Sequence, residues 1–127
     1  MADVTLGERE LDVMAVLWEI ESGTVEEVRQ RLPAALAYNT VLTVLRNLEA
    51  KHLVGHVEEG RAYRYHARVA QHTAQQSAVR RLVDQFFSGS PEALVARLVE
   101  SRTVSAAELK KLAASLSRPR KKPKEGK

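Results

Sequence analysis

The feature that most constrains the fold is an amphipathic stretch, residues 38–51, that is followed directly by two β-prone runs. Its apolar residues recur at the spacing of one helical face, and they are Val41, Val44, Leu45 and Leu48. The runs at residues 53–57 and 61–66 flank Glu58-Glu59-Gly60, which predicts a β-hairpin around a glycine-containing turn. We therefore expect a third helix that leads directly into a hairpin.

A first helix is predicted over residues 5–21. Thr5 and Glu8 have the spacing of a capping box, in which each residue binds the other's backbone N–H at a helix start. The apolar residues that follow at helical spacing are Leu11, Met14, Ala15 and Trp18. We expect these four side chains to face the core.

A second, shorter helix follows the break at Gly23. Thr24 and Glu27 repeat the capping-box spacing, and Pro33 ends the helix. Its buried side is expected to consist of Val25, Val28 and Leu32. The order helix, helix, helix, hairpin predicts a winged helix-turn-helix over residues 1–69, in a chain that is mainly α-helical with one small β-hairpin.

The next segment, residues 70–116, is expected to form three further amphipathic helices. Ser88-Gly89-Ser90-Pro91 separates the first two and also caps the second, since Pro suits the first helical position. Ser105 and Glu108 have capping-box spacing before the third. These helices are too few to bury a good core alone, so we expect a dimerisation region that packs against a second copy of the chain. The residues predicted to form the dimer are Leu82, Val83, Phe86, Phe87, Leu94, Val95, Leu98, Val99, Leu109, Leu112 and Leu116.

Charge is distributed unevenly along the chain. The net charge is +4, but residues 118–127 hold six Lys/Arg and one acid, so the remainder carries 4 − 5 = −1. Residues 1–28 carry −7 and residues 29–69 carry +4. The chain is therefore polarised, and its total charge does not by itself indicate nucleic-acid binding. Residues 117–127 predict a disordered basic tail, which either adds nonspecific DNA affinity or serves as a solvated tail.

The third helix is the strongest candidate for a functional surface. A helix that reads DNA needs an apolar back and short polar or cationic side chains in front. Thr contacts phosphates or bases, Asn pairs with adenine, and Arg pairs with guanine or phosphate. The residues that supply this set are Asn39, Thr40, Thr43, Arg46 and Asn47. The alternative interpretation is an ordinary amphipathic helix with a solvated front.

The hairpin offers two further cations. Arg61 and Arg64 are placed to contact backbone phosphates as a wing does. Glu58 and Glu59 favour the alternative, a solvent-exposed hairpin, because acids at a wing tip repel phosphate. Both interpretations stay open at this point.

Several other classes of protein are not supported. The chain has no cysteine, which excludes disulfides, thiolate metal sites and cysteine nucleophiles. Its four histidines have no convincing partners for a metal site, and no glycine-rich phosphate loop or nucleophile elbow is present. We expect no enzymatic activity, metal or cofactor. No apolar run is long enough to insert in a membrane and no secretory signal precedes the first helix, so a cytoplasmic location is expected.

Three segments resemble the penicillinase repressor family, BlaI/MecI/CopY. Residues 36–45 with Lys51-His52-Leu53-Val54 are similar to its recognition helix, residues 60–65 to its wing, and residues 6–14 with Leu17-Trp18 to its first helix. The resemblance implies a homodimeric repressor whose winged helices bind a dyad operator in double-stranded DNA and whose C-terminal helices form the dimer.

The resemblance also implies a route of release. Many members are paired with a membrane-bound sensor metalloprotease, which signals repressor cleavage in the C-terminal helices. In β-lactam-responsive members the cut falls at an Asn-Phe bond, and the matching position here is Arg97-Leu98. Copper-responsive members carry C-terminal cysteines, which this chain lacks.

A second function class remains open at this stage. A winged helix can also serve as a protein-interaction module without sequence-specific DNA binding. The acidic first helix and the acidic wing tip favour this alternative. A gel-shift experiment with the upstream region of the chain's own gene would separate the two functions.

Overall fold

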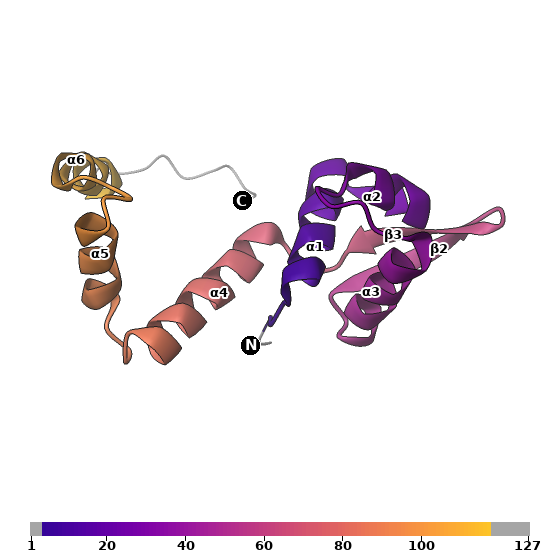
Figure 1. Ribbon diagram of the computed structural model, residues 1–127, viewed down its shortest axis with the longest axis horizontal. Coiled ribbons are helices and arrows are strands. Elements are labelled where there is room, and N and C mark those ends of the chain that lie inside the picture. The colour runs from indigo at the N-terminus through magenta and orange to yellow at the C-terminus, as the bar shows by residue number, and fades with distance from the viewer. Residues whose placement is uncertain (1–3, 118–127) are drawn as a thin grey trace, which may run out of the picture. The chain divides into compact units, whose positions relative to one another are not determined.

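The computed structural model describes residues 4–117 of the 127-residue chain. These residues form six helices and one three-stranded antiparallel sheet, so the chain is mainly helical, as predicted (Figure 1). They divide into two compact units, with the boundary between Arg80 and Arg81. None of the described helices is long and apolar enough to cross a membrane. Residues 118–127 of the predicted basic tail lie outside the described part, and Ser117 is the last residue of α6 (Ala106–Ser117).

The first helix starts later and faces the core differently than predicted. α1 (Glu8–Ile20) has Gly7 as its N-cap, and the Glu10 carboxylate accepts a hydrogen bond from the Gly7 N–H at 3.0 Å. The prediction of a Thr5–Glu8 capping box was therefore wrong. The predicted apolar face was wrong as well, because Leu11 and Ala15 are exposed. The buried residues of α1 are Val13, Met14, Val16 and Leu17.

Periodicity could not choose between these two faces. Both sets of α1 residues repeat at helical spacing, and both include Met14. The choice is made by packing, since α1 contacts α2, α3 and the strands β1 and β3. Helix α2 (Val25–Arg31) has the predicted capping box, with Thr24 Oγ1 and the Glu27 carboxylate each accepting the other residue's N–H at 3.2 Å.

A short strand that the sequence did not predict lies between α1 and α2. β1 (Ser22–Thr24) pairs with β3 (Ala62–Ala67), and β3 also pairs with β2 (Val54–Glu59), giving the order β1-β3-β2. Gly23 in β1 is buried, and a Cβ at this position would come within 2.9 Å of Ile20 Cδ1. A larger residue at this position would therefore require the Ile20 side chain to shift.

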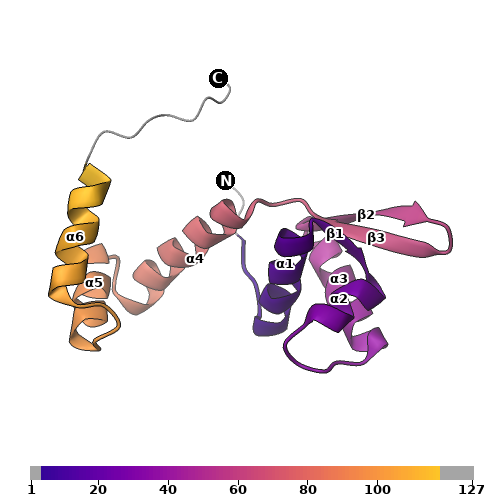
Figure 2. The ribbon, with the colours of Figure 1, turned by 90° about the horizontal axis from the view of Figure 1, so that it is seen from above.

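The hairpin turn is tighter than predicted. β2 continues through Glu59 and is paired with Ala62, so the loop consists of Gly60 and Arg61 only. Gly60 has φ of +63°, and a glycine with positive φ at the first loop position suits a two-residue type II′ hairpin turn. The hairpin extends beyond the helices of the first unit as the wing (Figure 2).

The core of the first unit extends past the hairpin into the next helix. The indole Nε1 of Trp18 donates to the Val69 carbonyl at 2.9 Å. In α4 (Gln71–Phe86), Ala74 belongs to the core, and Ser77 Oγ bonds the backbone N–H and carbonyl of Val4 at 3.2 and 3.3 Å. The division between the units accordingly falls inside α4, after Arg80, and later than the predicted boundary at residue 69.

The second unit contains the rest of α4, α5 (Pro91–Glu100) and α6. Ser90 caps α5 with Pro91 at the first helical position, as predicted. Ser105 and Glu108 form the predicted reciprocal cap of α6, at 2.8 and 3.0 Å. All residues of α5 and α6, which lie within the described range, are at least partly accessible to solvent.

Candidate nucleic-acid interface

The predicted recognition helix corresponds to α3 (Tyr38–Ala50), whose inner face is fully apolar. Three of its four predicted core residues have no accessible surface and the fourth is 8% exposed. They are Val41, Val44, Leu45 and Leu48. α3 packs on α1 and α2, and β2 follows it directly. Burial of a Leu or Val side chain stabilises a fold by about 1.5–3 kcal/mol, so this face fixes the helix firmly.

The opposite face of α3 presents the predicted polar side chains. Asn39, Thr43 and Arg46 are exposed and lie in one row, since residues four and three positions apart are neighbours on a helix. Thr40 and Asn47 form a second row beside it, with Thr40 half-buried and Asn47 exposed. The five predicted residues therefore share one accessible surface on a rigid element.

The other flank of α3 is joined to the wing by a cluster that was not predicted. The Glu49 carboxylate lies 2.7 Å from Nδ1 of His56 in β2. The His56 ring stacks on Tyr63 of β3 with ring centroids 4.2 Å apart, and Tyr65 beside them is almost completely buried. The sequence offered one signal for this cluster, the polar residue Glu49 on the flank of α3. The contact between Glu49 and His56 depends on the register of the hairpin, which a single sequence does not fix.

A lysine ties the end of α3 to the start of α1. Lys51 Nζ lies 2.7 Å from the Glu10 carboxylate and donates to the Thr5 carbonyl at 3.2 Å. Burial raises the pKa of Glu10, but the hydrogen bonds from Lys51 and the Gly7 N–H outweigh it, so the pKa is lowered overall. The Glu10 carboxylate thus caps α1 and also binds Lys51 at the end of α3.

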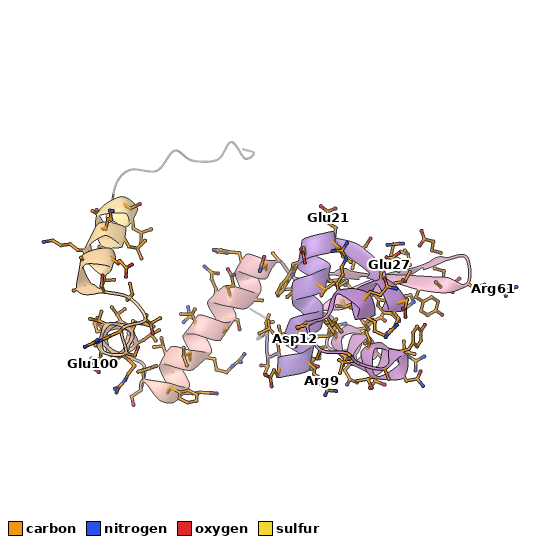
Figure 3. The ribbon with its side chains drawn as sticks, turned by 45° about the horizontal axis from the view of Figure 1, so that its top comes forward. Arg9, Asp12, Glu21, Glu27, Arg61 and Glu100 are labelled. Atoms are coloured by element: carbon orange, nitrogen blue, oxygen red, sulfur yellow. The ribbon has the colours of Figure 1, made fainter. Side chains whose placement is uncertain are left out.

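The two predicted wing cations are placed differently. Arg61 lies in the turn at the far end of the hairpin, where it is exposed and points away from the helices (Figure 3). Arg64, in β3, binds two carboxylates instead, with Nε at 2.8 Å from Glu59 and Nη1 at 3.1 Å from Glu27. Glu58 and Glu59 are exposed near the tip, as the sequence indicated. Only Arg61 of the pair faces solvent without a carboxylate beside it in the described contacts.

All but one of the residues predicted to form the dimer are at least partly accessible to solvent on the C-terminal helices. The most exposed of them are Leu82, Phe86, Leu112 and Leu116, and Phe86 alone is 74% exposed. Val83 is buried. The half-buried members are Phe87, Leu94, Val95, Leu98, Val99 and Leu109. Val95, Val99 and Leu109 line a shallow apolar groove between α5 and α6. Such a concentration of uncovered apolar side chains is unusual for a surface that faces only water.

The Arg97–Leu98 bond lies inside α5. Arg97 is exposed and its guanidinium is 3.2 Å from the Glu100 carboxylate, while Leu98 is half-buried. The Arg97 carbonyl accepts a hydrogen bond from the Ser101 N–H at 2.9 Å. A protease that needs extended backbone therefore has to unwind the end of α5 before it can cut here.

Comparison with known proteins identifies the family of this chain. The family model described as Penicillinase repressor matches residues 6–118. The chain belongs to the penicillinase repressor family. This confirms the resemblance drawn from the recognition helix, the wing and the first helix. It also confirms that the chain is not an enzyme, because the family consists of winged-helix transcriptional regulators.

Individual relatives agree with this placement. The chain is 46% identical over 69 residues to the transcriptional regulator BlaI of Mycobacterium tuberculosis, covering 51% of this chain and only 50% of that protein. It is 25% identical over 122 residues to the penicillinase repressor of Bacillus licheniformis, covering 94% and 95% of the two chains. The solved DNA-binding domain of the repressor BlaI matches at 28% identity with a TM-score of 0.50, covering 55% of this chain and 88% of that domain.

Proposed function

We propose that this chain is a transcriptional repressor that binds a dyad operator in double-stranded DNA through α3. The observation that carries the proposal is the exposed polar surface of α3 opposite a completely apolar, buried back. In winged-helix and related proteins the second helix of the helix-turn-helix enters the major groove. Membership of a repressor family supports the same use of the helix.

Each residue of this surface has a chemically defined role in the proposal. Asn39 and Asn47 are suited to adenine, and Arg46 is suited to the two acceptors of guanine. Thr40 and Thr43 contact base edges, a thymine methyl or phosphate. Arg61 reaches a phosphate from the wing tip. Glu49 lies outside the two rows of polar side chains, with its carboxylate against His56 on the flank of the helix.

The proposal includes a homodimer formed by the C-terminal helices. Support comes from the uncovered apolar side chains of α4, α5 and α6, among them Phe86, Leu112 and Leu116. One winged helix contacts few bases, whereas two copies on a dyad site add their contacts and fix a half-site spacing. A second copy is therefore the partner that both the apolar surface and the operator require.

The finer part of the proposal concerns release from DNA. A membrane-bound sensor metalloprotease would signal cleavage at Arg97–Leu98, which separates most of α5 from α6 and so divides the apolar stripes that form the dimer. The support is the family resemblance and the exposure of Arg97. The hydrogen bond on the Arg97 carbonyl means that cleavage should become faster when α5 is destabilised.

The direct test is DNA binding by the purified full chain. A duplex is first selected from a randomised pool by the wild-type protein, and its affinity is then measured by fluorescence anisotropy beside a random-sequence duplex. We expect Arg46→Ala to reduce the preference for the selected duplex. Lys111→Ala, which removes an exposed cation from α6, is the matched control and should leave the preference unchanged. Failure of the wild-type chain to enrich any duplex would contradict the proposal.

A further inference from the structure

Arg64 lies at the end of the three-stranded part of the sheet. In β3 it is the last residue toward the wing tip that pairs with β1, where its partner is Thr24. Its partner on the other side is Val57 of β2. Beyond Arg64 the wing continues as two strands only, and a two-stranded hairpin is marginally stable without further support. Arg64 therefore marks the point where the three-stranded sheet becomes the projecting wing.

The guanidinium of Arg64 bridges the wing and helix α2. Nε donates to Glu59 Oε1 at 2.8 Å, which lies in the outer part of the wing. Nη1 and Nη2 donate to the two carboxylate oxygens of Glu27 at 3.1 and 3.3 Å, and Nη1 also approaches the Ser22 carbonyl at 3.4 Å. Figure 3 shows Glu27 on α2 beside the strands of the wing. The planar guanidinium of Arg64 thus binds carboxylates from two separate elements, β2 and α2.

Glu27 is itself part of the helix-turn-helix. Its carboxylate accepts the Thr24 N–H at 3.2 Å and caps α2, the helix that precedes the recognition helix α3. The hydrogen bond from Arg64 is the main cause that lowers the pKa of Glu27, with the Thr24 N–H contributing next. The carboxylate is therefore held ionised by the two groups that it joins.

We propose that Arg64 is a positioning residue that sets the wing relative to the helix-turn-helix, and that it does not contact a DNA phosphate. To bind the guanidinium through two N–H groups, a phosphate would have to displace the Glu59 or the Glu27 carboxylate from one edge, and it would then lie beside a displaced acid. This inference rests on the proposed function, because the position of the wing matters only if the wing approaches DNA. Arg61 at the tip is the cation left to contact phosphate.

The two roles predict different salt dependences. Removal of a phosphate contact lowers the slope of log K against log salt by about 1. Arg64→Gln should leave this slope unchanged and weaken binding to the selected duplex roughly two- to five-fold, the range expected for exposed ion pairs. Arg61→Gln, the matched control from the same hairpin, should lower the slope. A slope that falls for Arg64→Gln as it does for Arg61→Gln would overturn the inference.

A mutant cycle tests whether Arg64 acts through its two carboxylates. In the Glu27→Gln/Glu59→Gln background, Arg64→Gln should have little further effect on amide hydrogen exchange in the wing. A further acceleration of wing exchange as large as that caused by Arg64→Gln in the wild-type chain would show that Arg64 does not act through these carboxylates. Circular dichroism of each full-length variant establishes that it is folded before the comparison is made.

A measurement without DNA separates this inference from the proposed function. Amide hydrogen exchange in the wing, over Val57–Ala62, should become about two- to five-fold faster in Arg64→Gln and in Glu27→Gln, and should not change in Arg61→Gln. Unchanged wing exchange in Arg64→Gln would refute the positioning role even if the chain binds an operator. Faster exchange in a chain that selects no duplex would support the bridge and refute the proposed function alone.

Discussion

Removal of α4 from the first unit is expected to destabilise the winged helix, although the order of helices and strands is complete by Val69. Two fragments make the comparison, residues 1–69 and residues 1–80. The shorter one loses the Ala74 methyl from the core and both hydrogen bonds between Ser77 Oγ and the Val4 backbone. A buried methyl group is worth about 1 kcal/mol, and each hydrogen bond contributes about 0.5–1.5 kcal/mol.

These contributions together make residues 1–69 about 2–4 kcal/mol less stable to unfolding than residues 1–80. Since a domain of this kind has only about 5–15 kcal/mol in total, the loss should be readily visible. Urea unfolding followed by the fluorescence of Trp18, the single tryptophan, should show a midpoint lower by about 1–2 M. Trp18 reports on the relevant region because its indole binds the Val69 carbonyl.

Point variants of the full chain control for the effect of truncation. Ser77→Ala removes both hydrogen bonds to Val4 and should lower stability by about 1–2 kcal/mol. Gln76→Ala, at the exposed neighbouring position of α4, should change stability by less than about 0.5 kcal/mol. Equal urea midpoints for the two fragments would refute the assignment of the first turns of α4 to the winged-helix core.

Three further predictions concern binding, assembly and pH. Arg46→Ala should weaken binding to the selected duplex by about 1–3 kcal/mol, measured by anisotropy, and undiminished selectivity would show that the recognition surface is misassigned. Phe86→Asp should convert a dimer to a monomer in sedimentation velocity while the thermal unfolding of the first unit is retained, and a full-length wild-type monomer that still binds a dyad site tightly would contradict the dimer. The pKa of Glu10 is lowered in the folded chain, so the unfolded chain takes up this proton first on acidification. The stability that Glu10 contributes is therefore complete at pH values above the ordinary range of a glutamate, and it is lost as pH falls through the lowered pKa. Glu10→Gln should therefore make the acid limb of the urea midpoint less steep, and an unchanged limb would exclude Glu10 as a source of the pH dependence.

Sequence patterns predicted best those features that depend on neighbouring residues. The capping boxes at Thr24–Glu27 and Ser105–Glu108 and the cap at Ser90–Pro91 formed as expected, because each is closed within one helical turn. The apolar back of α3 was also correct, since its polar and apolar faces differ sharply. Local chemistry was sufficient in each case.

Features that depend on distant contacts were missed. β1 consists of Ser22, Gly23 and Thr24, which have no clear strand signal. These residues form a strand because they pair with the edge of β3. The buried face of α1 depends on which side the other elements cover, and periodicity allowed two answers. Arg64 was identified as a cation in the wing, but its carboxylate partner Glu27 lies 37 residues away in the sequence. Only the folded chain brings such groups together.

The acidic character of residues 1–28 can now be interpreted differently. Taken as a charge total, it favoured a surface for a protein partner. Two of its acids have internal roles, since Glu10 holds Lys51 at the end of α3 and Glu27 holds Arg64 at the base of the wing. Each of these acids also caps the helix in which it lies. The N-terminal acids thus help to fix the two elements proposed to approach DNA, which removes part of the argument for a separate protein-interaction surface.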